Sequence, residues 1–98
     1  MRIQLERIGA MADVQVTCIN KRDRNSSHEG ITHLGGTNWK WPRAQVVESI
    51  EKKSNTFFTL VAGKRANVGI VNGPNGKYLR SYADDQWNDN LLALPECS

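Results

Sequence analysis

The stretch Thr56–Tyr82, TFFTLVAGKRANVGIVNGPNGKYLRSY, decides the fold. It contains three runs rich in β-branched and aromatic residues, at 56–62, 66–72 and 77–82, and such runs are typical of β-strands. The turn-forming segments GKRA and GPNG separate the runs, and the Asn75-Gly76 pair predicts a type I′ hairpin turn. Three consecutive strands joined by tight turns predict an antiparallel meander.

Two further features of this stretch predict how the strands pack. The run at 56–62 is apolar enough to predict a central place in the sheet. Gly69 lies inside the second run, where a glycine marks a bulge or the close approach of another group.

Upstream of the meander, residues 42–53 predict an α-helix. Pro42 suits the first turn, because the N–H that proline lacks would have no partner there. Val46, Val47 and Ile50 then recur at helical spacing and build one apolar face. Two lysines fall in the last turn, where positive charge complements the helix dipole.

The remaining strands are predicted before the helix. Val14–Ile19 alternates apolar and polar side chains, as a strand does, and is a natural edge strand. An exposed loop is expected over Asn20–Gly30 and a second short strand over Ile31–Leu34, which Gly35-Gly36 should end. The order β-β-α-β-β-β predicts an α+β fold, a small mostly antiparallel sheet with one helix packed on one face.

The C-terminal segment combines an acidic turn with an apolar run. A small sheet must cover its apolar face, so we expect one group of residues to do so: Trp87, Leu91, Leu92 and Leu94. The segment also holds three aspartates that match no calcium loop, and we expect them to form a solvated turn: Asp84, Asp85 and Asp89.

Length and charge bound the class of protein. Ninety-eight residues indicate one domain, expected over 13–98, with a disordered leader over 1–12. No stretch has the roughly 18 apolar residues of a membrane span, and no signal peptide is apparent, so a cytoplasmic protein without membrane contact is expected. The net charge of +3 combines a basic body with an acidic C-terminal segment. That distribution suits a tail that folds back or a body that meets a polyanion.

Four segments carry a family resemblance: DVQVTCINK (13–21), ITHLGG (31–36), the Trp-x-Trp motif before the helix, and GKYLRSYADDQWNDNLLALPEC (76–97). Together they resemble a bacterial family of small proteins called domain of unknown function 3892, over about Asp13 to Cys97. The resemblance implies no assigned activity, so no catalytic or binding residue is carried over from it.

Catalytic and metal chemistry are not favoured. Cys18 and Cys97 are expected to be free thiols, and a bridge between them would persist only in an oxidising compartment. With His28 and His33 they equal the ligand number of a zinc site, but no metal-binding spacing is present. One exposed and one sheet-face histidine are expected instead. Cys18 beside His33 could form a nucleophilic pair, but a strand in so small a domain offers no deep cleft. We therefore expect no catalytic residue, no metal and no cofactor.

A binding role remains, and two partners are considered. We expect a small accessory module that binds a protein partner or associates with itself. The alternative is weak binding of single-stranded nucleic acid, in which tryptophans stack on bases and basic residues contact phosphates. The candidate interaction surface comprises Trp39, Lys40, Trp41, Arg43, Lys64 and Arg65. A metal- or thiol-dependent enzyme is the third hypothesis.

Overall fold

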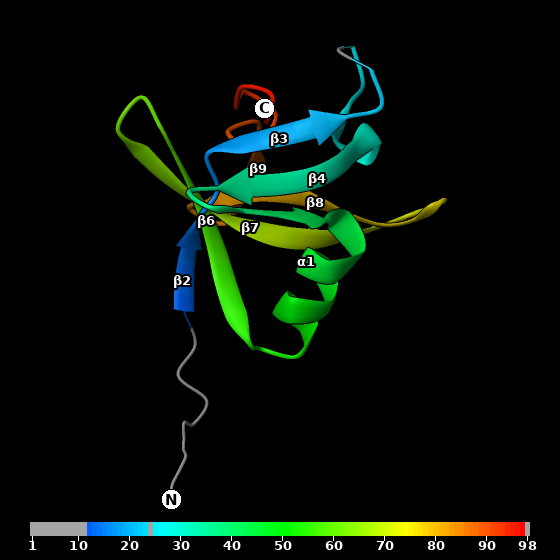
Figure 1. Ribbon diagram of the computed structural model, residues 1–98, viewed down its shortest axis with the longest axis horizontal. Helices are drawn as coiled ribbons and strands as arrows, with labels where there is room; N and C mark the ends of the chain where they lie inside the picture. Colours follow the sequence, from blue (N-terminus) through cyan, green and yellow to red (C-terminus); the bar gives the residue numbers. More distant parts are fainter. Residues whose placement is uncertain (1–11, 24, 98) are drawn as a thin grey trace, which may run out of the picture.

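The computed structural model describes residues 12–23 and 25–97 (Figure 1). Its elements follow in chain order: β2 (Ala12–Gln15), β3 (Cys18–Lys21), the 3-10 helix η1 (His28–Gly30), β4 (Ile31–Gly36), β5 (Trp39–Pro42), α1 (Arg43–Glu51), β6 (Asn55–Val61), β7 (Lys64–Gly73), β8 (Gly76–Ala83) and β9 (Gln86–Asn88). The predicted α+β class is confirmed. Of the predicted leader, residues 1–11 lie outside the described residues, and Ala12 begins β2.

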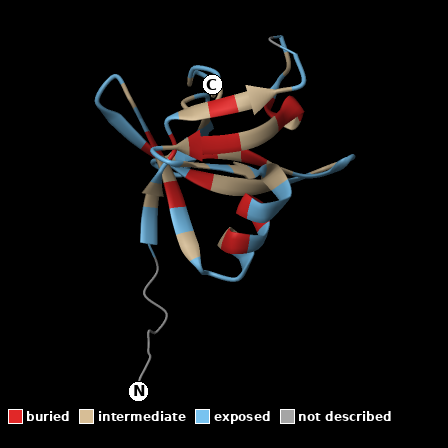
Figure 2. Ribbon diagram, in the orientation of Figure 1, coloured by how far each residue is buried: buried red, intermediate tan, exposed pale blue. Residues whose placement is uncertain are grey.

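The larger sheet has five strands in the order β2-β6-β7-β8-β9. The predicted antiparallel meander is confirmed by β6, β7 and β8, whereas β2 pairs with β6 in parallel. β6 lies inside the sheet, although β7 rather than β6 is the central strand. Buried and exposed positions alternate along β6 (Figure 2), with Phe57 and Thr59 buried and Leu60 exposed. One face of the sheet therefore lines the core and the other faces outward.

A second sheet was not predicted. It contains β3, β4 and β5, all antiparallel. The predicted strand over Val14–Ile19 is split between the two sheets, because successive amides donate in different directions. Val16 N–H donates to the Phe58 carbonyl at 2.8 Å, and Thr17 N–H donates to the Gly35 carbonyl at 2.8 Å. Each half forms an edge strand, as expected of this segment.

The strand β4 does not end at Gly35 and Gly36, as predicted, but includes both glycines. Their role is to admit close neighbours. A Cβ atom at Gly35 would lie 2.8 Å from the Sγ atoms of both Cys18 and Cys97. A Cβ atom at Gly36 would fall against the Trp39 indole. The chain turns two residues later instead, and continues into β5, a strand absent from the prediction.

The predicted type I′ turn at Asn75-Gly76 is wrong. Gly73 pairs with Gly76, so the turn residues are Pro74 and Asn75, and only Gly76 has a positive φ, of 115°. A type I′ turn needs positive φ at both central residues, which the proline ring forbids at Pro74. The neighbouring hairpin turns at Ala62 and Gly63, so of the predicted turn GKRA only the first residue takes part, and both turn residues have positive φ, 52° and 77°.

The helix α1 begins one residue after Pro42 and covers the core, but it ends at Glu51, before the two lysines that were predicted in its last turn. Val46 and Val47 are buried, and the helix contacts β4, β5, β6 and β8. The core also draws side chains from both sheets: Val16, Ile19, Ile31, Leu34, Phe57, Val68, Leu79 and Leu91 are all buried there. Within residues 12–23 and 25–97, no helix has the length and apolar character needed to cross a membrane.

Cys18 and Cys97 form a disulfide, so the expectation of two free thiols is wrong. Main-chain pairing brings the two residues together. Ile19 N–H donates to the Pro95 carbonyl at 3.0 Å, and Cys97 N–H donates to the Ile19 carbonyl at 3.1 Å. The Cα atoms of the two cysteines then lie 4.9 Å apart, within the usual range for a bridge. The C-terminal segment thus covers the free edge of β3.

The leucines near the C-terminus behave as predicted, but Trp87 does not. Leu91 is fully buried, and Leu92 and Leu94 pack against the core. Ser81 positions this run, because its Oγ accepts a 2.9 Å hydrogen bond from Leu91 N–H. Trp87 instead lies in β9 opposite Tyr82 and is 48% exposed. It therefore belongs to the outward face of the larger sheet.

The disulfide predicts a strong effect of reductant on stability. Replacing both cysteines (Cys18→Ser with Cys97→Ser) should lower the free energy of unfolding by about 2–4 kcal/mol, because the bridge restricts the unfolded chain. Urea denaturation with and without dithiothreitol measures this change. The wild type should lose stability in reductant and the double variant should not. Two titratable thiols in the folded wild type would contradict the bridge.

A matched leucine pair tests whether the C-terminal segment is part of the core. Leu91→Ala should destabilise the protein by about 2–5 kcal/mol, because it leaves a cavity at a fully buried site. Leu60→Ala, at a position that is 50% exposed, should cost less than about 1 kcal/mol. Chemical denaturation of both variants gives the comparison. Equal losses would show that residues 91–94 contribute little to the core.

Candidate functional site

The outward face of the five-stranded sheet carries a row of paired residues that crosses every strand. Each member pairs with the next in register: Gln15, Phe58, Asn67, Tyr82 and Trp87. Paired residues in neighbouring strands point to the same side of a sheet. We call this set the cross-strand row. It places three aromatic rings and two amide side chains on one surface.

Tyr82 and Trp87 form the most exposed part of the cross-strand row. Their ring centroids lie 5.6 Å apart with the planes at 77°, an edge-to-face contact. The two side chains remain 37% and 48% exposed. Gly69 leaves room for them, because a Cβ atom there would lie 2.9 Å from the Tyr82 ring. The close approach predicted at Gly69 is confirmed.

Arg65 is held in place beside the row. Its guanidinium carbon lies 4.0 Å from the centroid of the Phe58 ring, and its Nη2 lies 2.6 Å from Asp13 Oδ2. Asp13 Oδ1 also accepts a 2.8 Å hydrogen bond from Thr56 Oγ1. The hydrogen bonds from Arg65 and Thr56 lower the pKa of Asp13. Asp13 therefore stays ionised and keeps Arg65 over the aromatic ring.

The strands β6 and β7 diverge beside the cross-strand row (Figure 1), and a hollow lies there. Their pairing ends at Phe58 and Asn67, beyond which β6 pairs only with β2 and β7 only with β8. The hollow has a volume of about 470 Å³. Its apolar lining comes from Ile50, Phe57 and Val68, and its polar lining from Asp13, Thr56, Arg65, Asn67 and Tyr82. An apolar cavity with a polar surround can hold an apolar side chain and orient its polar neighbours.

Comparison with known proteins gives one match. The family model described as Protein of unknown function (DUF3892) matches residues 15–95. The chain belongs to this family. No curated protein and no solved structure gives a significant match. The resemblance noted in the sequence is confirmed, and the DUF3892 match spans the whole cross-strand row.

In this DUF3892 member, the predicted interaction surface is not one surface. Trp39 and Trp41 lie on the same side of β5, with centroids 5.9 Å apart, and both rings contact Phe57 edge-on or tilted. They pack against the core and are half-buried. Lys40 lies between them in the strand and so points to the opposite side. Stacking rings and a neighbouring cation are therefore not presented together.

The basic residues of the predicted surface are also separated. Arg43, the first residue of α1, donates a 2.8 Å hydrogen bond from Nη1 to the Glu29 carbonyl. Lys64 and Arg65 begin β7 at the end of the β6–β7 hairpin, away from α1 (Figure 1). Of the six predicted residues, Arg65 lies beside the cross-strand row, and Lys64 lines a neighbouring hollow together with Arg65 and Trp87. Phe58, Tyr82 and Trp87 were missed, although the alternation of 56–62 and 77–82 does place Phe58 and Tyr82 opposite the buried residues.

His28 is not the exposed histidine predicted from its loop. It is only 9% exposed, and its Nε2 lies 3.6 Å from Asp89 Oδ1, which also accepts a 3.2 Å hydrogen bond from Arg80 Nη2. Burial lowers the pKa of His28, and the positive charge of Arg80 lowers it further, while Asp89 opposes both. The folded protein therefore favours the neutral form of this imidazole over the charged form.

The other residues considered for chemistry are not brought together either. His33 Nδ1 lies 3.0 Å from Thr32 Oγ1, and Cys18 is bonded to Cys97, so the pair of Cys18 and His33 has no thiol. In the part of the chain that the structure describes, no three His, Cys, Asp or Glu residues gather as metal ligands would. Asp84 and Asp85 form the exposed turn between β8 and β9, as expected, with φ values of 54° and 64°.

The environment of His28 predicts that stability falls in mild acid. Below its ordinary pKa of 6.5, the unfolded chain takes up a proton at His28 that the folded protein resists. The free energy of unfolding should therefore decrease as the pH falls below that value. Urea denaturation at about pH 7.5 and about pH 5.5 should show a larger loss for the wild type than for His28→Gln. Equal losses would mean that His28 titrates alike in both states.

Proposed function

We propose that this DUF3892 member is a small accessory module that binds a protein partner through the outward face of its five-stranded sheet. The observation that carries the proposal is the exposure of Tyr82 and Trp87, at 37% and 48%, in a single cross-strand row beside an apolar hollow. Tryptophan, tyrosine and arginine dominate the energetics of protein interfaces, and this surface offers all three.

The surface is already arranged for binding. Gly69 lets the Tyr82 and Trp87 rings lie against the sheet, and Asp13 fixes Arg65 over Phe58. Side chains that are held in place before binding lose less conformational entropy when a partner arrives. The rings and the guanidinium can therefore contribute most of their contact energy to the complex.

The hollow indicates the chemistry of the partner. Its apolar lining suits an aliphatic or aromatic side chain that projects from a partner segment, while Asn67 can exchange hydrogen bonds with the main chain of that segment. β9, which carries Trp87, is the outermost strand of the sheet and offers an edge for an added strand. We therefore favour an extended partner segment with a bulky apolar anchor.

The charges around the row favour a protein over a polyanion. Lys64 and Arg65 are cations near the row, and Asp13, Asp84 and Asp85 balance them, while Arg80 on the same face of β8 as Tyr82 is paired with Asp89. A surface without net positive charge gains little from phosphates. The nucleic-acid alternative also relied on Trp39 and Trp41, whose rings are occupied in the core cluster.

The disulfide between Cys18 and Cys97 bears on the cellular compartment in which this binding would take place. The cytoplasmic location was expected because the sequence shows no apparent signal peptide or membrane span, and it was accompanied by the expectation that Cys18 and Cys97 are free thiols. Disulfides form and persist in oxidising compartments. The bond between Cys18 and Cys97 therefore supports an oxidising compartment as the place of binding.

Truncation of Trp87 should abolish most of the binding. Three proteins would each be used to capture partners from extracts of the cells in which the chain naturally occurs: wild type, Trp87→Ala and Gln45→Ala. The last is a matched control, because Gln45 lies on the exposed side of α1. A protein retained by wild type and control should be lost with Trp87→Ala, because loss of an interface anchor weakens binding at least about tenfold. Calorimetry with the purified partner then gives each affinity.

Two results would contradict the proposal. The first is a partner whose affinity is equal for wild type and Trp87→Ala, which would place its contact elsewhere. The second is a wild type that forms a dimer in sedimentation equilibrium while Trp87→Ala stays monomeric, because the occupant of the face would then be a second copy of the chain. Thermal unfolding of both variants confirms that any loss of binding does not come from misfolding.

A further inference from the structure

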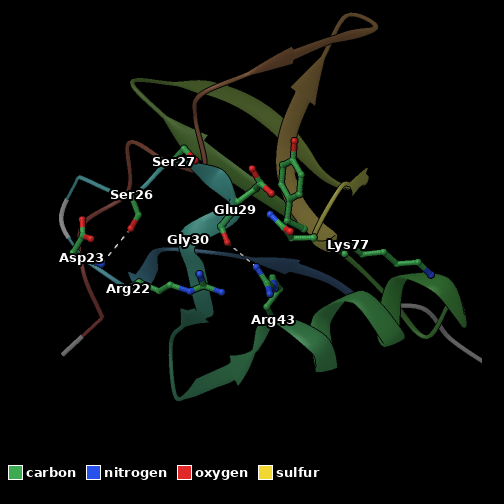
Figure 3. Close-up of a pocket in the computed structure, with 11 residues that line it drawn as sticks. Arg22, Asp23, Ser26, Ser27, Glu29, Gly30, Arg43 and Lys77 are labelled. Carbon is green, nitrogen blue, oxygen red and sulfur yellow. Dashed lines mark hydrogen bonds between the residues drawn. The ribbon is translucent and has the colours of Figure 1, made fainter.

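A second hollow lies on a different part of the molecule, between the loop after β3, the start of α1 and the turn between β7 and β8 (Figure 3). Its volume is about 410 Å³. Most of its lining is polar, and it includes the cations Arg22, Arg43 and Lys77 and the hydroxyls of Ser26 and Ser27. None of these residues belongs to the cross-strand row.

Two guanidinium groups share this hollow without a carboxylate between them. The side chains of Arg22 and Arg43 extend toward each other in Figure 3. Arg43 Nη1 donates to the neutral Glu29 carbonyl at 2.8 Å. Over residues 12–23 and 25–97, Arg22 and Arg43 form no ion pair, and no hydrogen bond from the Arg22 guanidinium is found. Two like charges at one cavity repel each other, and a bound anion would relieve that repulsion.

Two carboxylates, those of Asp23 and Glu29, also line the hollow, but neither forms an ion pair with Arg22 or Arg43 among the described residues. Asp23 is engaged in its own loop, where its Oδ1 accepts a 2.9 Å hydrogen bond from Asn25 N–H. The Glu29 carboxylate points away from Arg43 in Figure 3. Lys77, the third cation, forms an ion pair with Glu51 outside the hollow. The positive charge available to a ligand therefore comes from Arg22 and Arg43.

The loop that carries Arg22 is held in shape by its main chain. Arg22 N–H donates to the Gly30 carbonyl at 2.9 Å, and Gly30 N–H donates to the Ser27 carbonyl at 2.9 Å. Gly30 is needed for this closure, because a Cβ atom there would overlap the Ser26 side chain. The hydroxyls of Ser26 and Ser27 thus line the same cavity as the guanidiniums, and each can donate to an oxyanion.

We propose that this hollow binds a phosphate group, either as the free ion or as the head of a small phosphomonoester. Arginine forks donate paired hydrogen bonds to phosphate oxygens, and hydroxyls can satisfy the oxygens that remain. The cavity also extends to the Tyr78 ring and the Asn75 side chain, which leaves room for an organic group attached to the phosphate. This site does not depend on the protein-binding face.

The test is an NMR titration of the isotope-labelled full chain with inorganic phosphate. Phosphate replaces chloride stepwise, so that the ionic strength stays constant. Amide shifts should be saturable and confined to residues 22–30 and 75–78, with a dissociation constant of about 1 mM or tighter. Arg22→Gln should weaken binding at least about tenfold, because it removes a charged donor from an exposed position. The matched control Arg65→Gln, on the outward face, should leave the affinity unchanged.

A parallel titration with phenyl phosphate distinguishes the two sources of the group. Tighter binding than inorganic phosphate, with added shifts at Tyr78, identifies a phosphomonoester site, and equal binding identifies a site for the free ion. Shifts that do not saturate, or that sodium acetate reproduces, would overturn the proposal. Unchanged affinity in both Arg22→Gln and Arg43→Gln would overturn it as well. Trp87→Ala should bind phosphate normally, so the two proposals can fail separately.

Discussion

Two successive amides at Val16 and Thr17 determine how the two sheets are joined. The first donates into the five-stranded sheet and the second into the three-stranded sheet, so the chain passes between them without a loop. Val16 itself is fully buried at this crossing. Since each amide is satisfied in a different sheet, the angle between the sheets is set by main-chain geometry as well as by side-chain packing. The core between the sheets and α1 follows from this junction.

The parts of the fold that could be predicted are those whose signal is local. The meander and the helix are each specified by periodicity within a dozen residues, and both formed where expected. The second sheet was missed because a Gly-Gly pair favours the end of a strand, whereas Gly35 and Gly36 continue β4 and pair with β5. These glycines leave space for other groups: a Cβ atom at Gly35 would collide with the disulfide, and one at Gly36 would collide with the Trp39 indole. Such a packing requirement involves residues distant in sequence and leaves no local pattern.

The candidate site, like the fold, contains residues that a local sequence pattern could indicate and residues that only the folded structure brings together. Interleaved tryptophans and basic residues were the most visible functional pattern, yet Trp39 and Trp41 share a core cluster with Phe57. The exposed aromatic pair comes from two strands joined by Asp84 and Asp85, and β9 is too short to be recognised by alternation. Arg22 and Arg43 are brought to one cavity by the loop after β3, through contacts that no spacing of residues foretells. Surfaces made from several strands depend on register, which the sequence specifies only weakly.

The bond between Cys18 and Cys97 joins residues 79 positions apart, so nearly all of the folded chain lies within one covalent ring. A protease that cuts once in an exposed turn, such as Pro74–Asn75, would open the ring but leave both fragments attached to each other. The fragments would also stay paired through the main-chain hydrogen bonds of the sheets. The nicked protein would therefore keep its mass and much of its surface until a reductant separated the two pieces.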